Sequence, residues 1–174
     1  MKQTIIRKAK KSDIKAISTI EKEAYSDTVY ESFLLTKQDL KQQRKDKDMV
    51  MLVAERNGSI TGYILIDIAQ EDPSAANIDS LAVGSDYVGQ GIENLLLATA
   101  EQVAVEEGFD AITIQSAYED NIALKTLRRI GYQKTKHLGQ YFNNHAGIEL
   151  EKTLVTKAEQ TPGNVVVRKN VQAF

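Results

Sequence analysis

The segment Asn77-Ile-Asp-Ser-Leu-Ala-Val83 is followed by Gly84-Ser-Asp-Tyr-Val-Gly-Gln-Gly91 and then by Ile92-Glu-Asn-Leu-Leu-Leu97. The first part predicts a strand, the second is a glycine-punctuated turn, and the third opens a helix that keeps one apolar face. Such a turn lets backbone N–H groups approach phosphate oxygens, and the helix dipole favours negative charge there. Glycines between a strand and a helix can also serve only to permit a tight turn, so this feature alone leaves both interpretations open.

The composition is that of an ordinary globular protein. Of the 174 residues, 42% are hydrophobic and 26% are charged, which suits one domain with its own core. The formal net charge of -2 provides no basic excess for phosphate neutralisation, so no nucleic-acid partner is expected. The absence of cysteine excludes disulfides, thiolate metal sites and a cysteine nucleophile. His137 and His145 stand apart in the sequence, and no metal site is expected from them.

Two features of the sequence bear on its compartment. The segment from Met1 to Lys11 is charged and has no apolar core of signal-peptide length. No run of apolar residues is long enough to span a bilayer, so no membrane partner is expected. The sequence therefore predicts a cytoplasmic location.

Seven β-rich segments are spread along the chain. They lie at residues 3–8, 49–56, 59–67, 77–83, 111–115, 132–137 and 147–153. Asn57-Gly58 separates two of them and is the dipeptide best able to adopt the two positive φ angles of a tight turn, so a hairpin is expected there. Asn143, Asn144 and His145 are interpreted as a polar turn before the last segment.

Four segments have helical character. They are the stretch after residue 12, residues 36–45, residues 92–107 and the stretch up to Arg129. Ser12 or Asp13 can cap the first helix, and Asp120 or Asn121 can cap the last. The charged segment 36–45 has weak periodicity, and a loop is the alternative there. This order of strands and helices predicts an α+β domain over residues 1–154.

Residues 155–174 form a C-terminal extension. Its first part contains Pro162-Gly163 and is typical of a linker, whereas Val165–Val167 is apolar with strand propensity. An exposed apolar strand favours aggregation, so an additional strand is expected here, with pairing across a homodimer as one way to cover it.

The central segment resembles the acetyl-CoA-binding motif of the GNAT N-acetyltransferase superfamily in its strand, in Asp86-Tyr-Val-Gly-Gln-Gly-Ile92 and in Leu95-Leu-Leu97. The segment Asn121-Ile-Ala-Leu-Lys-Thr-Leu-Arg-Arg-Ile-Gly-Tyr132 is similar to the second signature of that family. The order of the elements also agrees over about residues 3 to 154. The resemblance implies a seven-stranded, mixed and mostly antiparallel sheet that splays between its fourth and fifth strands, flanked by about four helices.

The resemblance also implies acetyl-CoA as cosubstrate, with its pantetheine arm in the gap between the fourth and fifth strands. Backbone groups of the fourth strand would pair with the pantetheine amides, and the glycine loop would hold the pyrophosphate. The implied cofactor-binding residues are Leu81, Ala82, Val83, Val88, Gly89, Gln90, Gly91, Ile92, Glu93, Asn94 and Asn121.

In such enzymes an amine attacks the thioester directly, which requires a proton acceptor for the ammonium and a proton for the departing thiolate. Asp79 on the fourth strand is expected to be the acceptor, on one face with Asn77 and Leu81; a solvated strand residue is the alternative. Leu127 stands where many members have the tyrosine that protonates the thiolate. Tyr118 is therefore the preferred donor, ahead of Tyr132 and Tyr141, although tyrosines in sheet proteins are often simply packed.

Two further positions depart from the family pattern. Val88 replaces a usual Arg or Gln, which removes a charge-assisted bond to phosphate of about 1.5–3 kcal/mol. Glu93 replaces a usual Gly or Ala and either repels the phosphates or turns outward to stabilise its own helix.

Two functions follow. The first is an N-acyltransferase that moves an acetyl or similar group from a CoA thioester to a primary amine of a small molecule or peptide. Its acceptor pocket is expected between residues 25–48 and the hairpin 132–145. The alternative is a degenerate member of the family that serves as a binding or scaffold module, suggested by Val88, Glu93 and Leu127 together.

Overall fold

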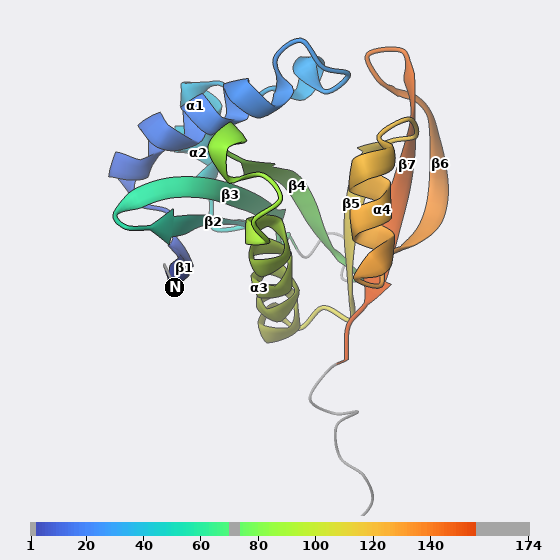
Figure 1. Cartoon of the computed structure of the whole chain (residues 1–174). Coiled ribbons are helices and arrows are strands. Elements are labelled where there is room, and N and C mark those ends of the chain that lie inside the picture. The colour runs from blue at the N-terminus through green and yellow to red at the C-terminus, as the bar shows by residue number, and fades with distance from the viewer. Residues whose placement is uncertain (1–2, 70–73, 156–174) are drawn as a thin grey trace, which may run out of the picture.

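The computed structural model describes residues 3–69 and 74–155, whose seven strands form one sheet in the order β1-β2-β3-β4-β5-β7-β6 (Figure 1). The strands are β1 (Thr4–Lys8), β2 (Met49–Arg56), β3 (Ser59–Asp67), β4 (Ala76–Val83), β5 (Ala111–Ala117), β6 (Gln133–Phe142) and β7 (His145–Thr153). The α-helices are α1 (Ile14–Tyr25), α2 (Lys37–Gln43), α3 (Ile92–Glu107) and α4 (Asn121–Arg129). Short 3-10 helices lie at Lys11–Asp13, Glu31–Phe33 and Ser85–Tyr87. The strand expected at 165–167, and any homodimer pairing through it, lie outside the described residues.

The sheet opens between β4 and β5. These strands are parallel neighbours and pair only where Ala76–Ile78 lies beside Ile112–Ile114. Beyond Ile78 the two strands diverge, and in Figure 1 β4 leans away from β5 on the side where α3 and α4 stand apart. The predicted mixed sheet with a splay between its fourth and fifth strands is thereby confirmed.

A β-bulge interrupts β4 at the start of the splay. Ile78 pairs with Ile66 and Ser80 with Leu65, so Asp79 is an extra residue without a partner on β3. The expectation that Asp79 shares one face with Asn77 and Leu81 is therefore wrong for Leu81, because the bulge reverses the alternation after Ile78, whereas the side chains of Asp79 and Asn77 stay in hydrogen-bond contact. Ser80 and Ala82 now lie on the α1 side, where Ser80 contacts Glu21.

Apolar side chains fill both faces of the sheet. On one side, α1 and α2 cover β2–β4 through fully buried Ile17, Leu40, Tyr63 and Leu65. On the other side, α3 and α4 pack on the sheet through a larger cluster; its members include Ile64, Ile66, Ile92, Leu96, Leu124, Leu127 and Tyr132. Each such side chain stabilises the fold by about 1.5–3 kcal/mol. Leu127 is thus a core residue of α4, and the segment 36–45, for which a loop was the alternative, contains a helix.

Turn and cap residues explain where several elements begin. Asn57 and Gly58 have φ angles of 53° and 79°, and the predicted hairpin is confirmed. Thr36 caps α2 by accepting a hydrogen bond from the Asp39 N–H, and Asp120 caps α4 by accepting one from the Ala123 N–H.

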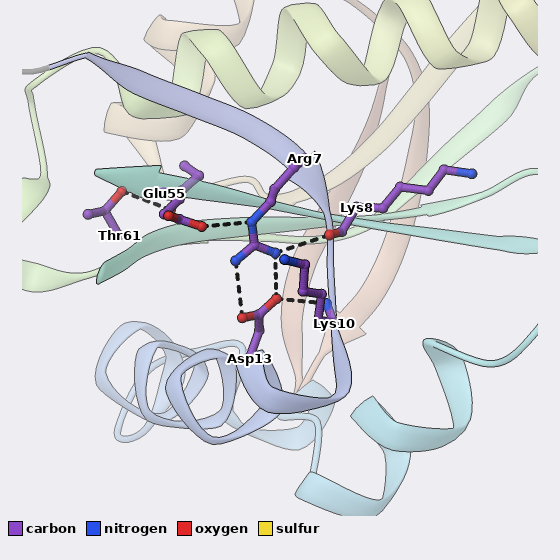
Figure 2. Close-up of polar contacts among 7 residues, drawn as sticks. Arg7, Lys8, Lys10, Asp13, Glu55 and Thr61 are labelled. Atoms are coloured by element: carbon purple, nitrogen blue, oxygen red, sulfur yellow. Dashed lines mark hydrogen bonds and ion pairs between the residues drawn. The ribbon is translucent and has the colours of Figure 1, made fainter. Parts of the chain in front are cut away.

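Asp13 does not cap α1 through its side chain. It accepts the Lys10 backbone N–H and forms an ion pair with Arg7, each at 2.7 Å, and Arg7 also reaches Glu55 at 2.7 Å. Figure 2 shows the Arg7 guanidinium between these two carboxylates. Its hydrogen bond holds the pKa of Asp13 below the usual range. This ion-pair group joins β1 and β2 to the start of α1.

The last hairpin is longer than predicted. β6 continues to Phe142, Asn143 and Asn144 turn with φ angles of 42° and 70°, and His145 belongs to β7 rather than to the turn. The reason is that β6 is an edge strand with exposed residues on both faces and three register shifts, so it has no alternating pattern.

Candidate functional site

A cleft of about 740 Å³ occupies the splay between β4 and β5. Its walls come from α1 and the segment before α2, from β4 and the glycine loop after it, from the start of α3, from β5, from α4 and from the end of β6. The predicted site residues that line it are Asp79, Leu81, Val88, Gly89, Gly91, Glu93 and Asn94. The splay therefore brings the glycine loop and the bulge of β4 into one cavity.

The glycine loop has the backbone conformation that its sequence predicts. Gly89 and Gly91 have φ angles of 76° and 80°, and a Cβ atom on either would meet no heavy atom within 4 Å. Glycine is therefore favoured by the backbone conformation, because any other L-residue would cost about 1–2 kcal/mol of conformational free energy there. Since Gly91 directly precedes α3, the first N–H groups of that helix border the cleft.

Two other residues of the loop support it from outside the cleft. Gln90 donates to the Asp86 carbonyl at 2.9 Å and accepts from Arg56 at 2.6 Å, so its side chain braces the turn. Ile92 is fully buried in the core and anchors the start of α3. Neither side chain lines the cavity.

The β4 wall offers backbone groups to the cleft. The Gly84 N–H donates to the Thr61 carbonyl at 2.9 Å, and the antiparallel register with β3 continues through Ala82. Backbone groups alternate in direction along such a pair, so those of Leu81 and Val83 point away from β3, toward the gap. The Tyr25 hydroxyl donates to the Leu81 carbonyl. The side chains of Ala82 and Val83 are buried in the core.

Asp79 faces the cleft from the bulge. Its carboxylate accepts a hydrogen bond from the Asn77 amide at 2.6 Å, and Asn77 is held in turn by Thr113 and Gln115 of β5, both at 2.9 Å. Burial raises the pKa of Asp79; the bond from Asn77 lowers it, and the nearby charge of Asp67 raises it. The carboxyl group of Asp79, with its raised pKa, therefore lies where β4 and β5 separate.

Glu21 is a second carboxyl of the cleft, which sequence reasoning missed. Its side chain is 1% exposed and accepts hydrogen bonds from the Leu35 N–H at 2.9 Å, from the Tyr63 hydroxyl and, at 3.4 Å, from the Ser80 hydroxyl. Burial raises its pKa, and these three donors act in the opposite direction. Its position seven residues after Ile14, on the apolar face of α1, is the signal that marks it in the sequence.

The structure does not bring Tyr118 to the cleft. Its ring is 56% exposed and stacks on His137 at 6.4 Å, with the Lys134 ammonium 5.8 Å from the ring centre. Asn121 is the first, exposed residue of α4, and it does not line the cavity either.

Tyr30 lies in the wall instead. Its hydroxyl donates to Asp120 at 2.8 Å and accepts from the Ala117 N–H at 3.1 Å. Burial raises the pKa of Tyr30 to about 12, so the phenol stays protonated near neutral pH.

Among the described residues that line the cleft, Arg129 is the only Lys, Arg or His, and it too was missed from the sequence. It ends α4, on the wall that faces the glycine loop, whereas the neighbouring Arg128 does not line the cavity. Among the described residues, no group of three or more His, Asp or Glu could hold a metal ion, and no helix is long and apolar enough to cross a membrane.

The comparisons agree with this architecture. The model of the acetyltransferase (GNAT) family matches residues 13–132, which is more than half of the chain. An uncharacterized N-acetyltransferase of Methanocaldococcus jannaschii is 29% identical over 141 residues, which is 80% of this chain and 85% of that protein.

Solved structures share the fold at low identity. The ribosomal-protein-S18-alanine N-acetyltransferase of Escherichia coli superposes with a TM-score of 0.76 at 14% identity, covering 92% of this chain and 100% of that one. A putative acetyltransferase of Salmonella typhimurium, solved with acetyl-CoA, gives 0.76 at 18% identity over 95% and 99% of the two chains. On the family match, this chain belongs to the GNAT family and is an acetyltransferase.

Proposed function

We propose that this acetyltransferase moves an acetyl group from acetyl-CoA to a primary amine, by direct attack with both substrates bound. The observation that carries the proposal is that one cleft joins a phosphate-type glycine loop to two carboxyl groups of raised pKa through the splay of β4 and β5. The acetyl-CoA in the Salmonella typhimurium structure, and the coenzyme A in one from Thermoplasma acidophilum, support the choice of cosubstrate.

The residues present fit the coenzyme. Backbone N–H groups of the loop 88–94 and the N-terminal end of α3 suit its phosphates. The backbone groups of Leu81 and Val83 suit the amides of its pantetheine arm. Arg129 lines the same cleft as Glu93 and provides the cation that Val88 does not.

Acetyl-CoA supplies a thioester carbonyl, and the protein must supply a route for protons. We assign to Asp79 the role of the base that accepts a proton from the substrate ammonium. Its carboxyl is open to the cleft, and its raised pKa makes it a better base than a free carboxylate. Glu21 is enclosed by three donors, so it holds Ser80 and the β4 wall in position.

The departing thiolate needs a hydrogen-bond donor. We assign this role to Tyr30 in place of Tyr118, because the Tyr30 phenol is protonated and lies in the cleft wall. Its one proton, which Asp120 accepts in the structure, would turn from that carboxylate to the sulfur as the thiolate forms. Orientation of the two substrates in one cavity supplies much of the remaining acceleration.

The experiment that tests this function measures CoA release, with a thiol reagent, from acetyl-CoA in the presence of a panel of primary amines. Amine-dependent release with formation of the acetylated amine supports the proposal. Saturable binding of acetyl-CoA without release for any amine would support the alternative, a family member that serves as a binding module.

A further inference from the structure

Five aromatic rings gather at one end of the cleft. Four lie in a chain of contacts: Tyr25 to Tyr30 at 5.7 Å, Tyr30 to Phe142 at 4.9 Å, and Phe142 to Phe33 at 5.2 Å. Tyr141 stacks on Phe33 at 5.3 Å. These rings come from the end of α1, the segment after it and the tip of the β6–β7 hairpin, which approach one another above the gap in Figure 1. All five line the cleft, and they are called the aromatic end below.

Two of these rings are open to solvent. Phe33 is 46% exposed and Tyr141 is 42% exposed, although both pack on buried Phe142. Exposed apolar surface at the mouth of a cavity is typical of a surface that a ligand covers.

The charged side chains next to the aromatic end are acidic among the described residues. The carboxyl group of Glu21 lies one helical turn before Tyr25 and accepts the Leu35 N–H, and Asp120 accepts the Tyr30 hydroxyl. Asp79 lines the same cleft from β4. Arg129, the one basic side chain that lines the cleft in residues 3–69 and 74–155, ends α4, about 12 Å along the helix axis from Asn121, which follows Asp120. In the part of the chain that the structure describes, the aromatic end thus offers no basic side chain to a substrate carboxylate.

We propose that the acceptor is an amine attached to an aromatic or similarly bulky apolar group, with no carboxylate beside the amine. This inference rests on the proposed acetyl transfer and names the class of its acceptor. An ammonium is attracted by ring faces and carboxylates, and the apolar body of the acceptor would cover Phe33 and Tyr141. A carboxylate in the same place would be desolvated without a partner and repelled by the carboxyl groups.

A matched series of amines tests this proposal. 2-Phenylethylamine has the ring and the amine, phenylalanine adds a carboxylate, phenylalaninamide adds a neutral group of similar size, and ethylamine lacks the ring. At saturating acetyl-CoA, kcat/KM for CoA release should be about a hundredfold higher for 2-phenylethylamine than for phenylalanine. The kcat/KM for 2-phenylethylamine should also be about tenfold higher than for ethylamine. Phenylalaninamide should recover most of the kcat/KM that is lost with phenylalanine.

Two variants assign the preference to the aromatic end. Phe33→Ala should remove the advantage of 2-phenylethylamine over ethylamine. Ile5→Ala, which truncates an equally exposed apolar side chain on β1 outside the cleft, should keep it. The proposal is overturned if phenylalanine is used as well as 2-phenylethylamine, or if ethylamine is used as well.

Calorimetric titration of 2-phenylethylamine into the protein with bound CoA separates this inference from the proposed function. Binding of this amine, with no binding of phenylalanine, supports the acceptor class even if no acetyl transfer is detected, and in that case only the proposed reaction fails. Transfer to other amines with no binding of 2-phenylethylamine overturns the acceptor class alone.

Discussion

The Tyr30 hydroxyl donates a 2.8 Å hydrogen bond to the carboxylate of Asp120, ninety positions further along the chain. Asp120 also accepts the Ala123 N–H at 3.0 Å and so caps α4. One carboxylate therefore ties the segment after α1 to the start of α4, across the opening of the cleft. The aromatic end and the helix that carries Arg129 are thereby joined in one framework.

Tyr30→Phe tests the assignment of the thiolate donor. The variant keeps the ring contact with Phe142 but lacks the hydroxyl, so kcat should fall by about a hundredfold with a smaller change in KM. Tyr118→Phe is the matched control, and its kcat should stay within about twofold of the wild type. Equal effects of the two substitutions would contradict the assignment.

Arg129→Ala tests the cation of the cleft. Loss of a charge-assisted bond to phosphate should weaken acetyl-CoA binding about ten- to a hundredfold in calorimetry, and the salt dependence of binding should decrease. Arg128→Ala removes the adjacent arginine, which does not line the cleft, and should change the dissociation constant by less than about threefold. If both variants bind acetyl-CoA equally well, Arg129 has no role in phosphate binding.

Glu93→Gln distinguishes an active enzyme from a degenerate one. In an active enzyme whose Glu93 turns away from the phosphates, neutralising this carboxylate should change acetyl-CoA affinity by less than about threefold, measured by titration. A much larger gain in affinity would mean that Glu93 disables the phosphate loop, as the binding-module alternative requires.

The pH profile of kcat tests Asp79 as the base. A base must be deprotonated to accept a proton, so activity should fall as the pH decreases through the raised pKa of Asp79. Asp79→Asn should lower kcat about a hundredfold or more and remove this acidic limb. Glu21→Gln should retain the limb, because Glu21 acts on the β4 wall; loss of the limb in this variant instead would reassign the base.

Asp13→Asn tests the ion-pair group in Figure 2. The folded-state pKa of Asp13 is lowered, so its stabilising effect is present above the unfolded-state pKa, about 4, and is lost as the pH falls through the lower folded-state value. At pH 7 the variant should be less stable by about 1.5–3 kcal/mol in urea unfolding. The difference from the wild type should shrink toward pH 2; a difference independent of pH would contradict this origin.

Local chemistry made much of the fold predictable. The Asn57-Gly58 turn, the Asp120 cap and the glycine loop each depend on residues within a few positions of one another, and each was confirmed. The splay followed from the family resemblance, which carries the order of the strands.

The missed features depend on contacts distant in sequence. The bulge at Asp79 is defined by its register with β3. The role of Tyr30 depends on a hydrogen bond to Asp120, which no pattern of neighbouring residues predicts. Arg128 and Arg129 are alike in sequence, and only the position of α4 beside the splay distinguishes them. The exposed edge strand β6 lacked an alternating pattern, so its length could not be predicted.

The proposed function requires the cleft between β4 and β5 to bind acetyl-CoA. Calorimetric titration of acetyl-CoA into the wild-type protein at modest salt tests it most directly. We expect saturable binding at one site with a dissociation constant on the order of micromolar, which corresponds to a binding free energy near -8 kcal/mol. No binding at millimolar acetyl-CoA would contradict it.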